Sequence, residues 1–267
     1  MTFMDHLEEL RWLLVRSTIV VLIMAMIIFF VSDYLFDEIV LAPLKPEFVT
    51  YGFFCDLAQQ LNVSDICVTA KDFNFIIQNT DMEGQVNILV WMCIVGGFIA
   101  GFPYILWEFW KFISPALYEK ERKGAKVFIT VSSLLFFIGV LFGYYLITPM
   151  SVNFFATFTV SDLVKNQFNL DSYMSMLKTS LIACGLFFEL PVIIYFLARL
   201  GLVTAELLRK TRRWSIVGIL VVAAIVTPPD VVSQVIVSIP MIIIFEGSIV
   251  IAALVGKKKK AEELANT

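Results

Sequence analysis

The sequence predicts an all-α integral membrane protein with six transmembrane helices and both termini in the cytoplasm. Three observations support this prediction: six long apolar stretches, the distribution of basic residues between them, and the composition. The 267-residue chain is 59% hydrophobic, with a mean hydropathy of +0.86, well above the apolar content of ordinary soluble domains. We expect a single membrane domain over residues 1–267.

The apolar stretches are long and uninterrupted. Most of them reach the roughly 20 residues that a helix needs to cross a bilayer. Only helices or closed barrels satisfy their backbone groups in lipid, and barrel strands would alternate apolar and polar residues. The stretches therefore predict helices at approximately 12–31, 86–107, 127–148, 176–198, 214–227 and 231–254.

The basic residues set the expected orientation. With the N-terminus placed inside, sixteen of the twenty lysines and arginines fall in inside segments, within residues 11–16, 111–126, 199–213 and 257–260. The four that fall outside are Lys45, Lys71, Lys165 and Lys178. Cytoplasmic loops of membrane proteins carry such an excess of basic residues, so six spans with both termini inside are predicted. The net charge of −3 does not oppose this, because acidic residues contribute little to orientation.

The outside segment after the first span, residues 32–85, is long and acidic. Because it includes Phe53, Phe54 and Phe75 among polar residues, we expect it to be folded. Cys55 and Cys67 also lie there. Since the space outside a bacterial cytoplasm is oxidising, a disulfide between these two cysteines is a hypothesis, which rests on location alone.

Glycine pairs indicate where membrane helices approach closely. Gly97 and Gly101 are four residues apart in the second predicted span, as are Gly139 and Gly143 in the third. Small residues at this spacing allow the backbones of neighbouring helices to come together. This pattern predicts packing rather than function.

Two acidic residues fall inside predicted spans. Glu189 lies near the middle of the fourth span, beside Pro191, which cannot donate a hydrogen bond to the carbonyl of Phe187. A carboxylate in hydrocarbon is costly, so we expect Glu189 to be protonated and hydrogen-bonded. It is either functional or a packing contact with a neighbouring helix. Glu246 lies nearer the cytoplasmic end of the sixth span, where its carboxylate can reach the interface.

The last two spans are expected to form a tight hairpin near the outer face. The fifth apolar stretch, residues 214–227, has only 14 residues, too few for a full bilayer. The link to the sixth stretch is Thr227-Pro228-Pro229-Asp230, in which the prolines end one helix and Asp230 can cap the next. We therefore expect short fifth and sixth helices, with local thinning of the membrane.

Catalytic chemistry has little support in the sequence. The chain has one histidine, His6, no Cys/His/acid cluster at metal-binding spacing and no glycine-rich phosphate loop. We predict no catalytic residue, metal, cofactor or nucleic-acid partner. Two rival functions stay open. A small-solute permease would need a polar path at the membrane midplane, and an intramembrane enzyme would need Glu189 and Glu246 to pair.

Several short motifs occur along the chain. The first, His-Leu-x-Glu-Leu-Arg, begins at His6, and the others are Ala42–Leu44, Trp110–Arg122, Phe188–Pro191, Thr227–Asp230 with Gln234, and Ile239–Met241. Taken in order, these motifs resemble the TatC family, the multi-spanning core subunit of the twin-arginine protein translocase. The chain departs from the family pattern in its longer first outside loop and in Leu13, where many members carry a second basic residue.

The resemblance implies a function in the bacterial cytoplasmic (inner) membrane. The family recognises signal peptides with paired arginines and helps move folded cargo proteins across the energised membrane, using the proton gradient. Its recognition acids correspond to Glu9 and Glu121, with Phe112 packing beside them. Carboxylates suit this task because guanidinium groups bind them through two parallel hydrogen bonds, which lysine cannot reproduce. Arg11 would orient the acids, although it can equally be a charge that sets topology.

The same resemblance assigns roles within and beyond the membrane. Glu189 would face outward and contact the single-span subunits TatA and TatB within an oligomeric complex. Pro43 would shape the start of the outer loop, and Asp230 and Gln234 would belong to the outer end of the transport path. Helix capping remains the simpler local explanation for Asp230.

Overall fold

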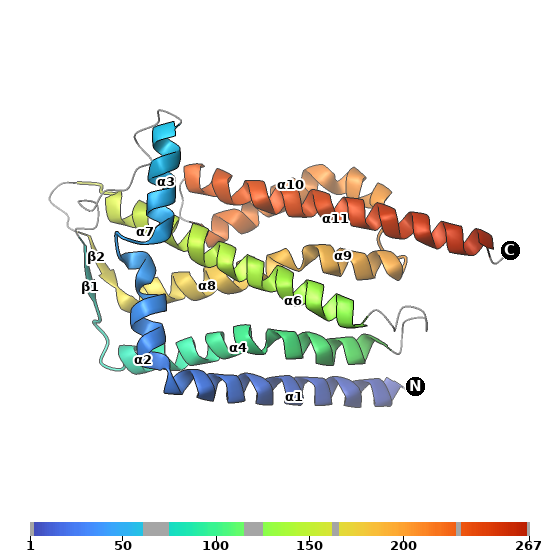
Figure 1. The fold of residues 1–267 in the computed structure, drawn as a ribbon, viewed down its shortest axis with the longest axis horizontal. Helices are drawn as coiled ribbons and strands as arrows, with labels where there is room; N and C mark the ends of the chain where they lie inside the picture. The colour runs from blue at the N-terminus through green and yellow to red at the C-terminus, as the bar shows by residue number, and fades with distance from the viewer. Residues whose placement is uncertain (1–2, 61–74, 115–124, 162–165, 228–230, 266–267) are drawn as a thin grey trace.

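The computed structural model describes residues 3–60, 75–114, 125–161, 166–227 and 231–265. Within these ranges, five helices are long and apolar enough to cross a membrane: Leu7–Phe30, Gly84–Ile113, Lys126–Thr157, Leu170–Arg199 and Ser233–Lys257. Both ends of the chain lie at the same end of the helix bundle, called the terminal end below; the opposite end is called the cap end (Figure 1). The multi-pass helical architecture is confirmed, whereas six spans and their orientation stay predictions.

The long helices follow the predicted apolar stretches closely. They are α1 (Phe3–Phe30), α4 (Gly84–Ile113), α6 (Ala125–Phe142), α8 (Leu170–Phe188), α9 (Leu190–Arg199), α10 (Ala205–Val226) and α11 (Val231–Ala265). The third stretch extends past its expected end at 148, because the π-helix η6 (Gly143–Ile147) leads directly into α7 (Thr148–Thr157). Pro149 lies in the first turn of α7, and the carbonyl oxygen of Tyr145, four residues before it, accepts a hydrogen bond from the Thr50 hydroxyl at 2.6 Å.

Glycines bring two helix pairs into close contact, as predicted. A Cβ atom at Gly97 of α4 would lie 2.7 Å from the backbone nitrogen of Ala25 in α1. A Cβ atom at Gly139 of α6 would lie 2.5 Å from the carbonyl oxygen of Cys184 in α8, and one at Gly143 would lie 2.7 Å from that of Ser180. The α1–α4 and α6–α8 pairs therefore pack too closely to admit a side chain at these points.

The fourth span is broken at Glu189, between α8 and α9. Glu189 ends α8, and its carbonyl oxygen accepts hydrogen bonds from Val192 and Ile193 at the start of α9. Pro191 occupies the first turn of α9. Pro191 accounts for this break in the predicted span, because proline cannot continue the hydrogen-bonding pattern of the preceding helix.

The expectation of short fifth and sixth helices is wrong, because α10 has 22 residues and α11 has 35. The start of α10 is capped by Thr204, whose hydroxyl accepts a hydrogen bond from the Leu207 N–H at 3.2 Å. Charged residues that favour helix then extend both elements beyond their apolar stretches. Only the apolar part of α10 is short, which is why α10 lies outside the set of five apolar helices.

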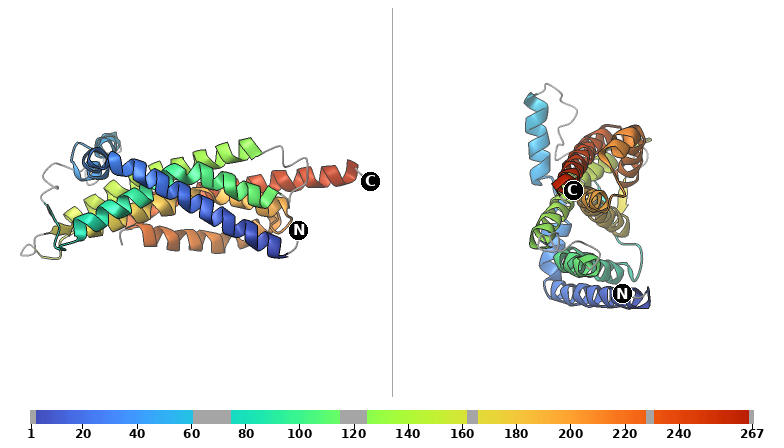
Figure 2. Two further views of the ribbon diagram at one scale, coloured as in Figure 1. Left: turned by 90° about the horizontal axis from the view of Figure 1, so that it is seen from below. Right: turned by 90° about the vertical axis from the view of Figure 1, so that its right-hand side faces the viewer.

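The described part of residues 32–85 is folded, as predicted. It contains α2 (Ser32–Leu35), the π-helix η1 (Phe36–Val40), the 3₁₀ helix η2 (Ala42–Leu44), α3 (Val49–Gln60) and β1 (Ile76–Gln78). Strand β1 pairs in parallel with β2 (Gln167–Asn169), which lies between α7 and α8. Helix α3 projects sideways from the bundle at the cap end (Figure 1; Figure 2).

The four cysteines divide as the sequence suggests. Cys93 and Cys184 are free and buried among the helices. Cys55, on α3, is disulfide-bonded. Cys67 lies outside the described residues, so the pairing of Cys55 with Cys67 stays a prediction.

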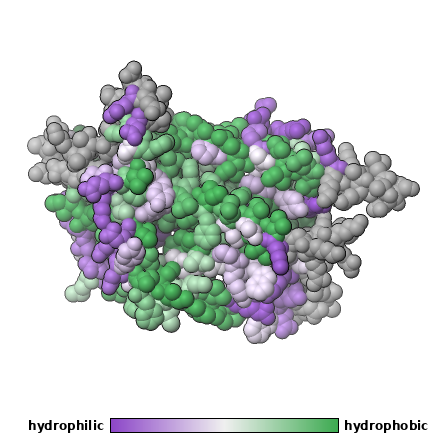
Figure 3. Space-filling view, viewed as in Figure 1, coloured by the Kyte–Doolittle hydropathy of each residue, from purple (hydrophilic) through white to green (hydrophobic). Residues whose placement is uncertain are grey.

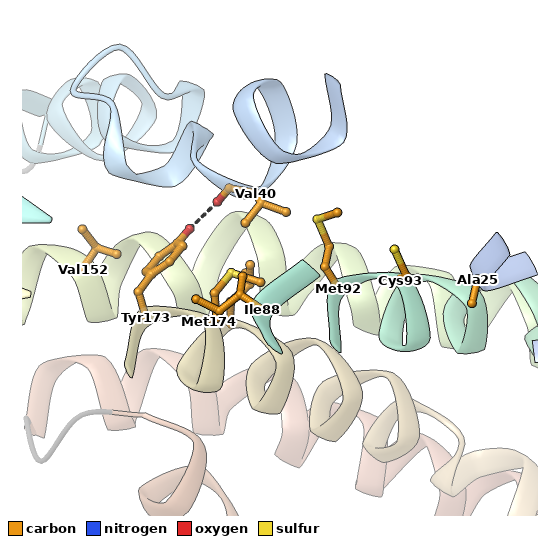
Figure 4. Close-up of a cluster of buried hydrophobic side chains, with 9 residues drawn as sticks. Ala25, Val40, Ile88, Met92, Cys93, Val152, Tyr173 and Met174 are labelled. Carbon is orange, nitrogen blue, oxygen red and sulfur yellow. Dashed lines mark hydrogen bonds between the residues drawn. The ribbon is translucent and has the colours of Figure 1, made fainter. Parts of the chain in front are cut away.

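Tyrosine hydroxyls form hydrogen bonds that hold the segments of the cap end against the long helices. The Tyr51 hydroxyl of α3 contacts the carbonyl oxygens of Pro43 at 2.7 Å and of Pro149 at 3.3 Å. Burial raises the pKa of the Tyr51 phenol, so it keeps the proton that it donates. The Tyr173 hydroxyl of α8 donates to the carbonyl oxygen of Val40 at 2.5 Å, and both residues belong to a buried apolar cluster (Figure 4).

The outer surface of the bundle is apolar between its two ends. Hydrophobic residues cover much of the middle of the visible face, and hydrophilic residues gather toward the two ends (Figure 3). Large apolar side chains are exposed along several long helices, among them Leu14, Phe30, Leu134, Ile225 and Leu254. Such a surface suits contact with lipid rather than water.

The glycine contacts predict opposite effects for two Gly→Ala variants. Gly139→Ala should lower the free energy of unfolding by about 1–3 kcal/mol, because a methyl group there meets the backbone of α8. Gly218→Ala on α10 should be neutral or slightly stabilising, because a Cβ there meets nothing within 4 Å. Thermal unfolding of the purified proteins in detergent measures both. Equal stability of the two variants would contradict the close α6–α8 packing.

Candidate functional site

A cavity of about 460 Å³ opens between the first turns of α1 and the last turns of α4, at the terminal end. Residues three or four positions apart share one helix face, and the close α1–α4 packing brings two such faces together. The lining residues combine acidic, basic and aromatic side chains: Glu8, Glu9, Trp12, Leu13, Arg16, Glu108, Lys111 and Phe112.

Glu9 and Phe112, both predicted as site residues, line this same cavity. The Glu9 Oε2 atom is buried and has no hydrogen-bond partner among the described residues. An unpaired buried carboxylate oxygen is costly, so it favours the arrival of a donor. Glu121, the other predicted acid, lies outside the described residues, and its convergence with Glu9 stays a prediction.

Arg11 does not line the cavity described above. Its guanidinium lies over the ring of Trp12, 5.6 Å from the ring centroid. Arg16, about one turn further along α1, is the arginine that pairs with an acid in this region. The orienting role predicted for Arg11 therefore stays a prediction, and Arg16 is an additional site residue.

Glu108 is a functional candidate that the sequence reasoning did not single out. Its side chain is only 3% exposed, and it is paired with Lys111 Nζ at 2.7 Å and with Arg16 Nη1 at 3.3 Å. A buried carboxylate needs such partners, since burying it alone would be costly. The i,i+3 spacing of Glu108 and Lys111 was a visible signal in the sequence, but the contribution of Arg16 depends on how α1 packs.

The two tryptophans at the end of α4 have different positions. Trp107 is 46% exposed, as expected for an interfacial aromatic residue, and its ring lies 4.0 Å from the Lys111 ammonium. Trp110 is buried instead, with its ring 4.8 Å from that of Phe128 and 5.7 Å from that of Phe196. Trp110 therefore fixes the end of α4 against α6 and α9, which holds one wall of the cavity in place.

Glu189 lies inside the bundle and not on its surface. Its side chain accepts a hydrogen bond from the Ser132 hydroxyl of α6, and the residue is only 5% exposed. The other carboxyl oxygen, Oε1, has no hydrogen-bond partner among the described residues. This inward position differs from the outward one that direct contact with a partner subunit would need, so a partner role requires α6 and α8 to part.

Glu246 has a separate partner on the neighbouring helix. Its Oε1 atom lies 2.5 Å from the Arg212 Nε atom of α10. The two acidic residues of the expected spans thus bind different groups, Ser132 and Arg212, which opposes the pairing that an intramembrane enzyme would need.

The predicted residues of the cap end fall in two groups. Pro43 is buried, and its carbonyl oxygen anchors Tyr51. Gln234 of α11 donates through Nε2 to the Leu220 carbonyl oxygen of α10 at 3.2 Å, which ties the last two helices together. Asp230 lies outside the described residues. The proposed transport roles of these three residues stay predictions.

Comparison with known proteins agrees with this fold. The family model for the Sec-independent protein translocase protein TatC matches residues 5–240. The TatC protein of Blattabacterium sp. subsp. Periplaneta americana is 39% identical over 259 residues, covering 97% of each chain. The TatCy protein of Bacillus subtilis is 31% identical and covers all of this chain and 94% of its own.

The fold is also similar to that of a solved structure. A crystal structure of the twin arginine translocase receptor TatC aligns with a TM-score of 0.71 at 31% identity, covering 94% of this chain and 99% of that one. The long apolar helices define a multi-pass membrane protein, and the sequence matches place it among protein-transport proteins. The chain belongs to the TatC family of Sec-independent protein translocase proteins.

The contact between Glu189 and Ser132 predicts a graded effect of substitution. Glu189→Gln keeps an oxygen that can accept the Ser132 hydroxyl, whereas Glu189→Ala removes the acceptor and leaves a void. The alanine variant should be less stable than the glutamine variant by about 1–3 kcal/mol. Thermal unfolding in detergent measures the difference, and equal stability of the two variants would show that the contact contributes nothing.

Proposed function

We propose that this protein recognises signal peptides with paired arginines at its terminal end, which faces the cytoplasm. The orientation is supported by the sixteen basic residues that the sequence places inside. Arg209, Lys210, Arg212 and Arg213, for example, lie in the first half of α10, the half nearer the terminal end. The solved relative, described as a twin arginine translocase receptor, supports the same function.

The observation that carries the proposal is the unpaired Glu9 carboxylate oxygen in the α1–α4 cavity. A guanidinium group would satisfy this oxygen with a charge-assisted hydrogen bond. Glu121 follows the described end of α4 by eight residues, so a short segment separates it from the same cavity. Phe112 and Trp12 provide apolar walls that limit solvent screening of the ion pairs.

A second cavity suits the apolar part of a signal peptide. It has a volume of about 610 Å³ and lies toward the cap end. Its lining combines apolar residues of α4, α6 and α8, among them Val95, Leu141 and Leu177, with residues of the cap end such as Ile39 and Phe48. Gly96 also lines it, and the space that a Cβ atom there would fill is occupied by the Ile28 side chain of α1. An apolar peptide segment that entered here would replace lipid contacts with protein contacts while the arginine pair stayed at the terminal end.

Transport itself requires other subunits. The bundle has no charged central channel among its described residues, and its buried acids bind neighbouring helices. We assign this protein the role of core subunit, which assembles with TatA and TatB type single-span proteins around the lipid-exposed helices near Glu189 and α10. The proton gradient would drive movement of folded cargo across the bacterial inner membrane, because the sequence has no recognisable nucleotide site.

The recognition proposal predicts a specific defect in a double variant. Glu9→Ala combined with Glu121→Ala should still insert into the membrane but lose crosslinks to a signal peptide that carries paired arginines, because both acceptors are gone. Site-specific photo-crosslinking from the peptide measures binding, and protease protection measures insertion. Glu206→Ala, at an exposed acid on α10, is the matched control. Undiminished crosslinking in the double variant would refute the proposal.

The partner proposal predicts that hydrogen bonding at Glu189 matters more than charge. Glu189→Gln should co-purify with more of the single-span subunits than Glu189→Ala, since an amide can donate to a polar group on a partner helix. Quantitative co-purification from membranes measures this. Equal loss of partner in both variants would instead point to a charged carboxylate.

A further inference from the structure

Glu108 is a buried acid whose two cationic partners lie at the protein surface. The Glu108 side chain is 3% exposed, whereas those of Arg16 and Lys111 are 51% and 45% exposed. All three line the α1–α4 cavity together with Glu9. The acid is therefore held in place by its surroundings, while both cations are free to turn away into solvent.

Each resident cation also has an aromatic ring within reach. The Lys111 ammonium lies 4.0 Å from the Trp107 ring centroid, and the Arg16 guanidinium carbon lies 5.9 Å from that of Trp12. Cations are attracted to the faces of such rings. A cation displaced from Glu108 would thus keep a favourable contact on its own helix, which lowers the cost of the displacement.

The contacts that Glu108 now makes leave room for stronger ones. Lys111 offers a single ammonium contact to Oε1, and Arg16 reaches Oε2 through one nitrogen at 3.3 Å. The Tyr104 hydroxyl also donates a hydrogen bond to Glu108. None of these contacts matches the two parallel short hydrogen bonds that a guanidinium can form with a carboxylate. An incoming arginine can make that bidentate contact.

We propose that Glu108 is a third carboxylate of the arginine-binding site, and that Arg16 and Lys111 are resident counterions which a paired-arginine ligand displaces. This inference rests on the proposed function. It adds a source of selectivity that Glu9 and Glu121 do not supply. A ligand lysine that replaces Lys111 exchanges one ammonium for another and gains nothing, whereas a ligand arginine gains a second hydrogen bond.

The exchange model makes opposite predictions for two substitutions at Lys111. Lys111→Gln removes a competitor of the ligand, so binding of a paired-arginine peptide should tighten and binding of its paired-lysine twin should tighten more. Lys111→Arg keeps the charge but gives Glu108 the better resident partner. Binding of the paired-arginine peptide should then weaken by roughly tenfold to a hundredfold, the value of one hydrogen bond to a charged group.

The experiment uses the full-length protein in lipid nanodiscs and two synthetic signal peptides that differ only in the arginine or lysine pair. Fluorescence anisotropy gives the dissociation constant of each peptide for native protein, Lys111→Gln, Lys111→Arg and Glu108→Gln. Lys210→Gln is the matched control, because Lys210 is an exposed lysine of α10 that does not line the cavity. A purely structural ion pair predicts the reverse, with Lys111→Arg close to native and Lys111→Gln impaired.

The outcomes separate this inference from the function on which it rests. Opposite shifts for the two Lys111 variants, with a lower arginine-to-lysine preference in Glu108→Gln and no change in the control, support the exchange. If native protein prefers paired arginines but Lys111→Arg binds them as tightly as native protein does, the exchange is overturned and recognition stands. If native protein shows no preference, both are overturned.

Discussion

The cost of placing a carboxylate among apolar helices governs the arrangement of this protein. Glu108, Glu189 and Glu246 all lie on long helices, and each has a partner on another helix: Arg16, Ser132 and Arg212, respectively. These contacts join α1 to α4, α6 to α8 and α10 to α11. Glu9 and Glu189 each keep one buried oxygen without a partner among the described residues, but of these two acids only Glu9 lines the cavity at the terminal end. That difference marks the terminal end as the place where a ligand can complete the structure.

The packing of the helices makes such a site possible, because it holds the two walls of the cavity, α1 and α4, in fixed positions relative to each other. Gly97 brings α1 against α4, so that Glu9 and Phe112 line one cavity although they are more than a hundred positions apart in the sequence. Trp110 packs against Phe128 and Phe196, which fixes the end of α4. A cradle for paired guanidinium groups needs this rigidity, because bidentate hydrogen bonds tolerate little movement of the acceptor.

Much of the fold was predictable, because the length of an apolar stretch and the spacing of its glycines can both be read from a short segment of the sequence. The apolar stretches matched long helices, the Gly97 and Gly139 contacts were confirmed, and Pro191 marked the break at Glu189. Helix length was harder to predict at α10 and α11, because charged helix formers continue a helix without adding to the apolar pattern. For that reason the expected short helices were wrong.

The site was less predictable than the fold. Motif resemblance pointed to Glu9 and Phe112, which do share a cavity. The contact of Arg16 with Glu108 joins residues 92 positions apart and depends on the rotation of α1 against α4, which no local pattern encodes. The inward direction of Glu189 likewise follows from α6–α8 packing rather than from its neighbours in sequence.

Convergence of Glu9 and Glu121 is the central claim, and a crosslinking measurement tests it directly. The four native cysteines are replaced by serine, and cysteine is introduced by Glu9→Cys and Glu121→Cys. Membranes are then treated with a bifunctional thiol reagent. The distance between its two reactive ends does not exceed the combined length of two neighbouring arginine side chains. The account predicts an efficient intramolecular crosslink that a paired-arginine peptide suppresses. Two cysteines that each react with a monofunctional reagent but never crosslink would contradict it.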